Sequence, residues 1–237
     1  MSLDAHPTPP DRQAMLHELA DGIWEITQPL RFLGMAIGTR MTVIGLPSGG
    51  LLLHSPIAVD DALARELEAL GPVEQVVCPN AYHHLHAPQV QERYPDAKLI
   101  VAPGAAKKQR AMRIDATLDE SEDDAWGETI APITIEGSML GETVLFHRPS
   151  GTLVSADLLE YFEHHDELIT RTYLKLGGVY GQASWNRLLR FVYRDKKKAR
   201  ASIDRLLELP IERITIAHGL VIEGDAREAL ERGFSWL

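Results

Sequence analysis

Residues 73–86 read VEQVVCPNAYHHLH, and this stretch shapes our interpretation of the rest of the chain. It begins with a short, mostly apolar run over residues 73–78, which is typical of a buried strand. The run leads directly into Pro79 and Asn80, residue types that favour a turn, and then into His83 and His84. Loops that follow strands are held by a rigid scaffold and often carry binding residues. The stretch therefore predicts a functional loop at the end of a sheet.

Two other predicted strands end in metal-ligating residue types. Asp157 follows a strand over residues 153–156, and His218 follows a strand over residues 213–217. Imidazole and carboxylate groups suit zinc, iron or manganese. For any one residue alone, a hydrogen-bonded histidine or a capping aspartate is the simpler interpretation. Their joint placement at strand ends favours a metal site.

The remaining pattern predicts an α/β protein. We expect further strands over residues 22–27, 41–46, 50–54, 97–101, 129–135 and 143–147. We expect helices over residues 60–70, 197–209 and 225–237, and others near Pro88 and Pro103. Strand-rich segments mixed with helices in both halves suggest an αββα sandwich, with two mixed β-sheets flanked by helices. We expect one domain over residues 1–237, with a helical insertion or lid at about residues 160–195.

Composition limits the classes of function. The chain has 237 residues and a formal net charge of −10, which argues against nucleic-acid and anionic-membrane partners. Cys78 is the only cysteine, so a disulfide framework and a Cys-rich zinc site are both excluded. No apolar run approaches the roughly 18 residues of a membrane span. Residues 1–11 lack the pattern of a secretory signal, which makes the cytoplasm the expected location.

Two segments of the chain are strongly charged. The basic run of residues 194–200 is interpreted as the solvated face of a helix in preference to a phosphate site. The acidic segment 119–124 is expected to be a loop, because its spacing does not suit a cation cage.

Several motifs resemble the metallo-β-lactamase superfamily over nearly the whole chain. Its nearest likeness is to a bacterial branch of unknown function whose histidine loop reads N-x-x-H-H-L, here Asn80, His83, His84 and Leu85. Other agreements are Asp21-Gly22-Ile23-Trp24 near the beginning and His218-Gly219 near the end.

The resemblance implies a metal site reduced to one half. The parent loop is H-x-H-x-D-H, and the helix that follows it aligns His84 with the last histidine and His83 with the aspartate. The first two histidines then fall on Pro79 and Ala81, and the next family histidine falls near Ser138. Asp157 matches the bridging aspartate and His218 the final histidine. The implied site holds one divalent metal, zinc before iron or manganese, on His83, His84, Asp157 and His218.

The adjacent positions of His83 and His84 impose a geometric condition on this ligand set. Adjacent residues on an extended strand point to opposite faces, so His83 and His84 both reach one metal only where a turn reorients them. His86 is close enough in sequence to compete with His83 as a ligand, although the alignment of the following helix disfavours it. His147, His164 and His165 are expected to face solvent.

Three residues are candidates for a catalytic role: Asp157, His54 and Tyr161. His54 lies where many relatives have an aspartate beside the metals, and a purely structural histidine is an equal alternative. Tyr161 follows Asp157 closely and could donate a proton, although a core or interface tyrosine is the simpler interpretation.

The leading hypothesis is a metal-dependent hydrolase that activates water on an ester, lactone, thioester or phosphoester of a small molecule. The alternative is a catalytically inactive binding or regulatory protein of the same fold, without metal. Redox chemistry at iron is a third hypothesis. An apolar rim that includes Phe32, Leu33, Met35, Tyr161 and Phe162 suggests a partly apolar substrate, and it equally fits a homodimer contact.

Overall fold

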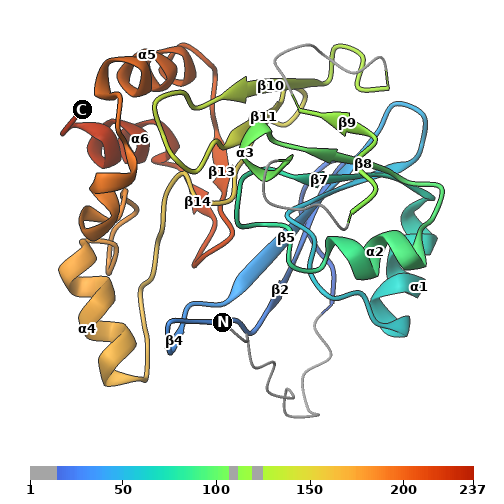
Figure 1. Ribbon diagram of the computed structural model, residues 1–237, viewed down its shortest axis with the longest axis horizontal. Helices are drawn as coiled ribbons and strands as arrows, with labels where there is room; N and C mark the ends of the chain where they lie inside the picture. The colour runs from blue at the N-terminus through green and yellow to red at the C-terminus, as the bar shows by residue number, and fades with distance from the viewer. Residues whose placement is uncertain (1–14, 107–111, 119–124) are drawn as a thin grey trace.

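The computed structural model describes residues 15–106, 112–118 and 125–237, and it places two β-sheets face to face between outer helices (Figure 1). One sheet has seven strands in the order β1-β2-β5-β6-β7-β8-β9, and the other has five in the order β10-β11-β12-β13-β14. Both sheets mix parallel and antiparallel pairs. The αββα sandwich predicted from the sequence is therefore confirmed.

The elements have the following bounds. The seven-stranded sheet contains β1 (His17–Ala20), β2 (Ile23–Gln28), β5 (Thr39–Gly45), β6 (Leu51–His54), β7 (Val73–Cys78), β8 (Lys98–Val101) and β9 (Ala116–Thr117). The five-stranded sheet contains β10 (Ile130–Thr134), β11 (Thr143–His147), β12 (Thr152–Val154), β13 (Arg213–Thr215) and β14 (Ile222–Glu223). A separate hairpin consists of β3 (Arg31–Phe32) and β4 (Met35–Ala36). The helices are α1 (Asp61–Leu70), α2 (Ala87–Arg93), α3 (Pro103–Ala106), α4 (Leu168–Gly177), α5 (Lys196–Leu207) and α6 (Ala226–Phe234), and a 3₁₀ helix, η1, spans Arg187–Val192.

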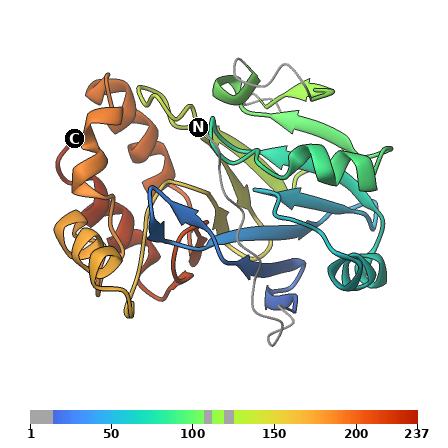
Figure 2. The same cartoon turned by 60° about the horizontal axis from the view of Figure 1, so that its bottom comes forward.

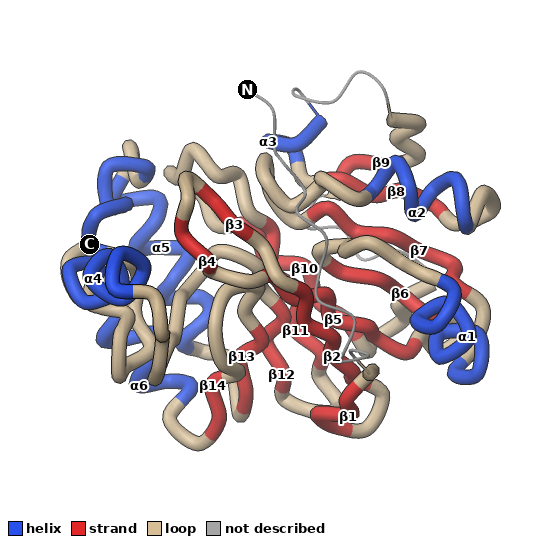
Figure 3. Tube along the Cα trace, turned by 90° about the horizontal axis from the view of Figure 1, so that it is seen from below, coloured by secondary structure: helices blue, strands red, loops and turns tan. Residues whose placement is uncertain are grey.

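The alternation of side chains along the strands divides the core into layers. In β7, Val76 and Cys78 pack with α1 and α2, whereas Val77 packs between the two sheets with Leu145 and Val154 of the opposite sheet. Side chains of α5 and α6 cover the outer face of the five-stranded sheet. Figures 2 and 3 show these helices on one side of the molecule and α1 and α2 on the other. An apolar core between the two sheets, distinct from the cores under the helices, thus holds the sheets together.

Parallel pairing explains why functional residues gather at one edge. β6 pairs in parallel with β7, and β12 pairs in parallel with β13. Parallel neighbours present their carboxyl ends at the same edge of a sheet. The loops that follow β7, β12 and β13 contain His83, Asp157 and His218 respectively. The parallel pair places the loops after β12 and β13 together, and the packing of the two sheets brings the loop after β7 to them, where Asn80 bonds to Asp157.

Most predicted elements are confirmed within one or two residues. Asp60 caps α1 as expected, because its carboxylate accepts hydrogen bonds from the N–H groups of Ala62 and Leu63. The short strands β1, β3, β4, β9 and β14 were not predicted. Residues 160–195 contain α4 and η1, and a role of this segment as an insertion or lid stays a prediction. The acidic segment 119–124 lies outside the described residues. No helix in the described ranges is long and apolar enough to cross a membrane.

Candidate metal centre

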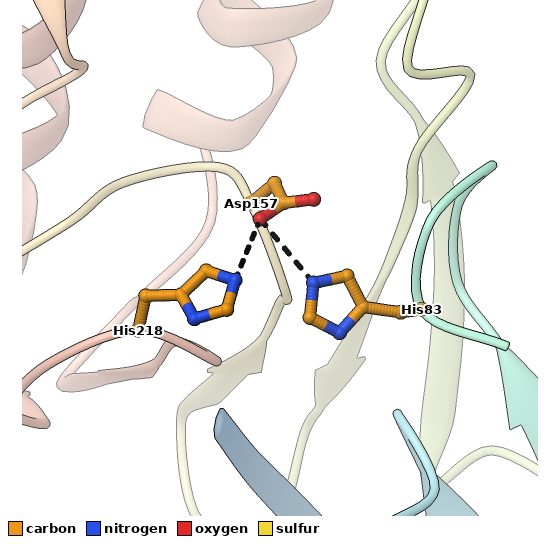
Figure 4. A group of neighbouring side chains, drawn as sticks. All are labelled: His83, Asp157 and His218. Atoms are coloured by element: carbon orange, nitrogen blue, oxygen red, sulfur yellow. Dashed lines mark hydrogen bonds and ion pairs between the residues drawn. The ribbon is translucent and has the colours of Figure 1, made fainter. Parts of the chain in front are cut away.

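Three side chains from three different loops meet at one point. His83 Nε2 lies 3.3 Å from Asp157 Oδ1, and His218 Nε2 lies 3.4 Å from the same oxygen. Figure 4 shows the two rings on either side of the carboxylate, with a ring nitrogen of each directed at it. One potential ligand atom from each residue lies within 4.8 Å of the other two. Two imidazole nitrogens and a carboxylate oxygen at this spacing form a donor set that suits a divalent metal.

The far nitrogen of each imidazole ring is held by a partner of its own. His218 Nδ1 donates to the backbone oxygen of Gly38 at 2.7 Å, and His83 Nδ1 lies 2.7 Å from Ser55 Oγ. These contacts fix the orientation of both rings, and with Nδ1 as the donor the lone pair of Nε2 is available to a metal. The donor set therefore fits a metal in its spacing and in the orientation of its rings.

Asn80 connects the histidine loop to the carboxylate. Its side-chain nitrogen donates to Asp157 Oδ2 at 2.8 Å and to Glu142 Oε2 at 3.2 Å. Its side-chain oxygen accepts from the N–H groups of Tyr82 at 2.8 Å and His83 at 3.1 Å. An Asn that bonds to the backbone two residues ahead is the expected Asx turn after a strand. The same residue thus shapes the loop and holds the carboxylate in place.

Glu142 is buried directly behind this cluster. Its carboxylate accepts from the N–H of Ala156 at 2.8 Å and from the N–H of Asp157 at 2.9 Å. Burial and the neighbouring charge of Asp157 raise the pKa of Glu142 to about 7. Glu142 therefore fixes the backbone at the end of β12, and with it the position of Asp157.

The pKa values of Asp157 and His218 shift in opposite directions. Burial by itself raises the pKa of Asp157, but the charges and hydrogen bonds of His83 and His218 outweigh it and hold that pKa well below its usual value. Burial by itself lowers the pKa of His218, but contact with Asp157 outweighs it and raises that pKa. The site therefore favours an ionised carboxylate with a positive charge beside it, which is the charge pattern that a cation would also satisfy.

The structure does not bring His84 into this cluster. Its ring is half-exposed, and its Nδ1 lies 3.0 Å from the backbone oxygen of Tyr82. Asn80 organises the loop around His83, and the adjacent residue consequently points elsewhere. The predicted four-residue ligand set is reduced to three in this arrangement. His86, the alternative ligand, is at the N-terminal cap of α2 and is also outside the cluster.

His54 lies at the end of β6, and its side chain is fully buried. Within the described part of the chain, neither of its ring nitrogens has a hydrogen-bond partner. Burial, together with the charge of nearby His83, lowers the pKa of His54 to about 3, so its ring is uncharged at neutral pH. The structure thus places His54 beside the cluster; its predicted catalytic role stays a prediction.

Tyr161 is not part of the cluster. Its hydroxyl donates to Glu163, and the residue lines a separate hollow of about 480 Å³ together with Arg40 and Leu220. Phe162 is buried against Leu174 and is therefore not a rim residue, which corrects that prediction.

The expectation that His147 faces solvent is also wrong. The residue ends the interior strand β11 and is buried, and its Nδ1 lies 2.7 Å from Ser150 Oγ. His164 is exposed as expected, whereas His165 is half-buried and donates to the backbone oxygen of Ala36 at 2.7 Å.

A second buried polar group beside the site was not predicted. The side-chain nitrogen of Asn186 donates to Glu160 Oε2 at 3.2 Å and to the hydroxyl of Tyr173 at 3.0 Å. Burial raises the pKa of Glu160, and the nearby His218 charge partly opposes this. Asn186 caps the N-terminus of η1 and Tyr173 lies in α4, both segments with weak sequence patterns. Only the short distance between Glu160 and Asp157 in sequence could have suggested this group.

The three positions that the resemblance aligns with the first metal site supply no ligand side chain. The backbone oxygen of Pro79 accepts from Thr143 at 2.9 Å, and the N–H of Ala81 donates to Leu140 at 3.1 Å. Ser138 Oγ accepts from the N–H of Leu140 at 3.2 Å. Backbone contacts between these loops thus occupy the region where the alignment places the lost histidines.

Comparison with solved structures defines the class of fold. A metallo-β-lactamase from Pontibacter korlensis matches with a TM-score of 0.67 and 13% identity, over 94% of this chain and 98% of that one. The metallo-β-lactamase FIM-1 from Pseudomonas aeruginosa, in its mono-zinc form, matches with a TM-score of 0.65 and 13% identity, over 96% of each chain. The chain therefore has the metallo-β-lactamase fold.

The family follows from the sequence. The profile of DUF4336, a domain of unknown function, matches residues 20–175, and the chain belongs to this family. No curated protein matches the chain. The resemblance noted in the sequence is thus confirmed for the fold, whereas the N-x-x-H-H-L loop as a signature of the branch stays a prediction.

Proposed function

We propose that this protein is a metal-dependent hydrolase with a single divalent ion held by His83, Asp157 and His218. The observation that carries the proposal is the directed geometry of the cluster. Both Nε2 atoms face the same carboxylate oxygen, and both Nδ1 atoms are held by other groups. A solvent-exposed ion pair would not require such fixed ring orientations.

Three protein ligands are the number found in catalytic zinc sites, where a further coordination position stays open. A zinc ion there would supply Lewis-acid chemistry and lower the pKa of a bound water to about 7. The chain's own residues hold the ligands in place. Ser55 and Gly38 orient the two rings, Asn80 holds the second oxygen of Asp157, and Glu142 fixes the backbone from which Asp157 projects.

The mono-zinc form of FIM-1 supports a one-metal site in this fold. Two histidines and one carboxylate also form the ligand set of many non-haem iron sites, so the metal analysis must distinguish zinc from iron and manganese. Bound iron with a visible absorption band would favour the redox hypothesis over hydrolysis.

The proposed substrate is a small ester, lactone, thioester or phosphoester with an apolar part. Phe32 and Leu33 are exposed at the turn of the β3–β4 hairpin. The chain that leaves this hairpin supplies the Gly38 oxygen that binds His218. Apolar side chains on a hairpin so closely connected to the site support an apolar contact with the substrate.

Metal analysis of the purified protein tests the proposal. After dialysis against zinc and removal of excess metal, we expect about one equivalent in the wild type and a large loss in His83→Ala and His218→Ala. His164→Ala is the matched control, because His164 is exposed and pairs only with Asp166 in the described structure. Less than about a tenth of an equivalent of any divalent metal in the wild type would contradict the proposal and favour the metal-free binding protein.

A further inference from the structure

A second hollow lies on the side of the molecule formed by η1, the beginning of α5 and the segment after α6. Its volume is about 450 Å³. Its lining consists of Arg190, Phe191, Tyr193, Arg194, Lys196 and Trp236. Three of these six residues are cationic and none of them is acidic. None belongs to the metal cluster, so this hollow is a separate feature of the fold.

Trp236 holds two of the cations in place. The guanidinium carbon of Arg190 lies 4.8 Å from the centre of the indole ring, and Lys196 Nζ lies 5.3 Å from it. Such distances are typical of cation–π contacts. The ring is fixed in turn, because Trp236 Nε1 donates to Gly233 at 2.9 Å and Tyr193 packs edge-on at 5.7 Å. Two positive charges are therefore held beside one fixed ring.

These charges lack the carboxylate partners that several arginines have elsewhere in the protein. Examples of such pairs are Arg40–Glu25, Arg93–Asp61 and Arg213–Glu223. In the described part of the chain, Arg190, Arg194 and Lys196 form no ion pair, although the whole chain carries a net charge of −10. Arg190 Nε is buried and has no hydrogen-bond partner among the described residues.

Grouping like charges in this way has an electrostatic cost. Like charges repel one another, and the repulsion is stronger where the dielectric constant is lower. Burial, followed by the charge of nearby Arg187, lowers the pKa of Arg190. An anion bound in the hollow would remove this repulsion. Arginine beside an aromatic ring is also well suited to bind phosphate oxygens in pairs.

We propose that this hollow binds an organic phosphate that carries at least two negative charges. The volume lies within the roughly 300–1,000 Å³ that is typical of small-molecule sites, which is more than inorganic phosphate needs. Phe191 is 59% exposed at the hollow and offers an apolar surface to the organic part of the ligand. On this assignment Arg194 and Lys196, two residues of the exposed basic run, also line a phosphate site. The assignment does not depend on the metal site.

Isothermal titration of the full chain with adenosine triphosphate and with pyrophosphate tests the site. We expect saturable binding at low ionic strength, tighter for the nucleotide than for pyrophosphate. Arg190→Gln and Lys196→Gln should each weaken binding about tenfold or more. Lys197→Gln is the matched control, because Lys197 is the next residue of α5 and does not line the hollow. It should change the dissociation constant less than about twofold. Phe191→Ala should remove the preference for the nucleotide.

Four results would overturn the assignment. The first is no binding of either probe at about 1 mM. The second is an equal effect of Lys197→Gln and Lys196→Gln, which would indicate only general attraction to a basic surface. The third is loss of binding in His218→Ala but not in Arg190→Gln, which would place the phosphate at the metal centre. The fourth is tighter binding of a single-stranded oligonucleotide than of the triphosphate, which would indicate a nucleic-acid surface.

Discussion

Asn80 links the histidine loop to Asp157 and Glu142, and its removal would take one hydrogen bond from each carboxylate and from the N–H of His83. We expect Asn80→Ala to lower the free energy of unfolding by about 1–3 kcal/mol. Because Asn80 also orients a ligand, zinc affinity should fall roughly 10–100-fold. Urea unfolding and zinc titration with a chromogenic chelator measure the two effects.

Gln75→Ala separates those two effects. Gln75 is buried between the sheets and accepts from Trp126 Nε1 at 2.6 Å, away from the cluster. We expect a comparable loss of stability with unchanged zinc affinity. Equal losses of zinc affinity in both variants would show that Asn80 acts only through global stability.

His54 gives a prediction for the dependence of stability on pH. Its pKa is lowered from 6.5 to about 3 in the folded protein, so its contribution to stability is present above pH 6.5 and is lost as the pH falls below it. His54→Leu should therefore lose less stability than the metal-free wild type on acidification. The difference in unfolding free energy between the two proteins should shift by about 1 kcal/mol in favour of the variant between pH 7.5 and 5.5. Urea unfolding at the two pH values measures it, and a constant difference would contradict the buried, uncharged state of His54.

Part of the site could be predicted from residue types and their place in the sequence. The sequence predicts His83, Asp157 and His218 because each follows a strand, and strand ends can be read from local patterns; the structure brings these three side chains together. Ser55, Gly38 and Glu142 were missed, since their contacts span 28, 180 and 15 residues of sequence and depend on how the sheets pack. His84 was included because an alignment fixes a position in the chain but not the direction of a side chain within a turn.

At the scale of elements, the loop after β13 depends on Gly219. Its φ of +101° strains any residue with a side chain. An added Cβ would also lie only 1.9 Å from the backbone oxygen of Tyr161, so there is no room for a side chain. We expect Gly219→Ala to displace the loop, to destabilise the protein by more than about 2 kcal/mol and to weaken zinc binding through His218.

Gly181→Ala is the control for backbone strain alone. Gly181 also has a positive φ, of +77°, but nothing lies within 4 Å of its added Cβ. The free energy of unfolding of this variant should fall by only roughly 1–2 kcal/mol, the cost of a left-handed backbone conformation for alanine, and its zinc affinity should not change. If the two variants had the same stability and zinc affinity, the contact with Tyr161 would have no part in holding the loop.

The longer elements were predictable and the shortest were not. α1 combines a capping aspartate, a buried face and a terminal glycine, so its sequence signals agree with one another. β9 and β14 consist of two residues each, and the hairpin strands β3 and β4 are equally short. Segments of this length have no periodicity to detect, and they exist only because a neighbouring strand offers hydrogen bonds.

At the scale of the whole molecule, a bound ion should stabilise the folded state. Zinc present at 100 times its dissociation constant adds about 2.7 kcal/mol, which corresponds to a rise in Tm of roughly 5–10 °C for a chain of this size. Differential scanning fluorimetry with zinc and after chelation measures the shift. His218→Ala should show little response, and an equal response in this variant would place the ion elsewhere.

The three proposed ligands are divided between the two layers of the sandwich. His83 follows a strand of the seven-stranded sheet, whereas Asp157 and His218 follow strands of the five-stranded sheet. A coordinated ion would therefore cross-link the two sheets. Sliding of one sheet over the other would distort the coordination shell of the ion. With cobalt in place of zinc, such a distortion would change the visible absorption spectrum of the bound ion. Relative movement of the two sheets could then be followed by absorption spectroscopy.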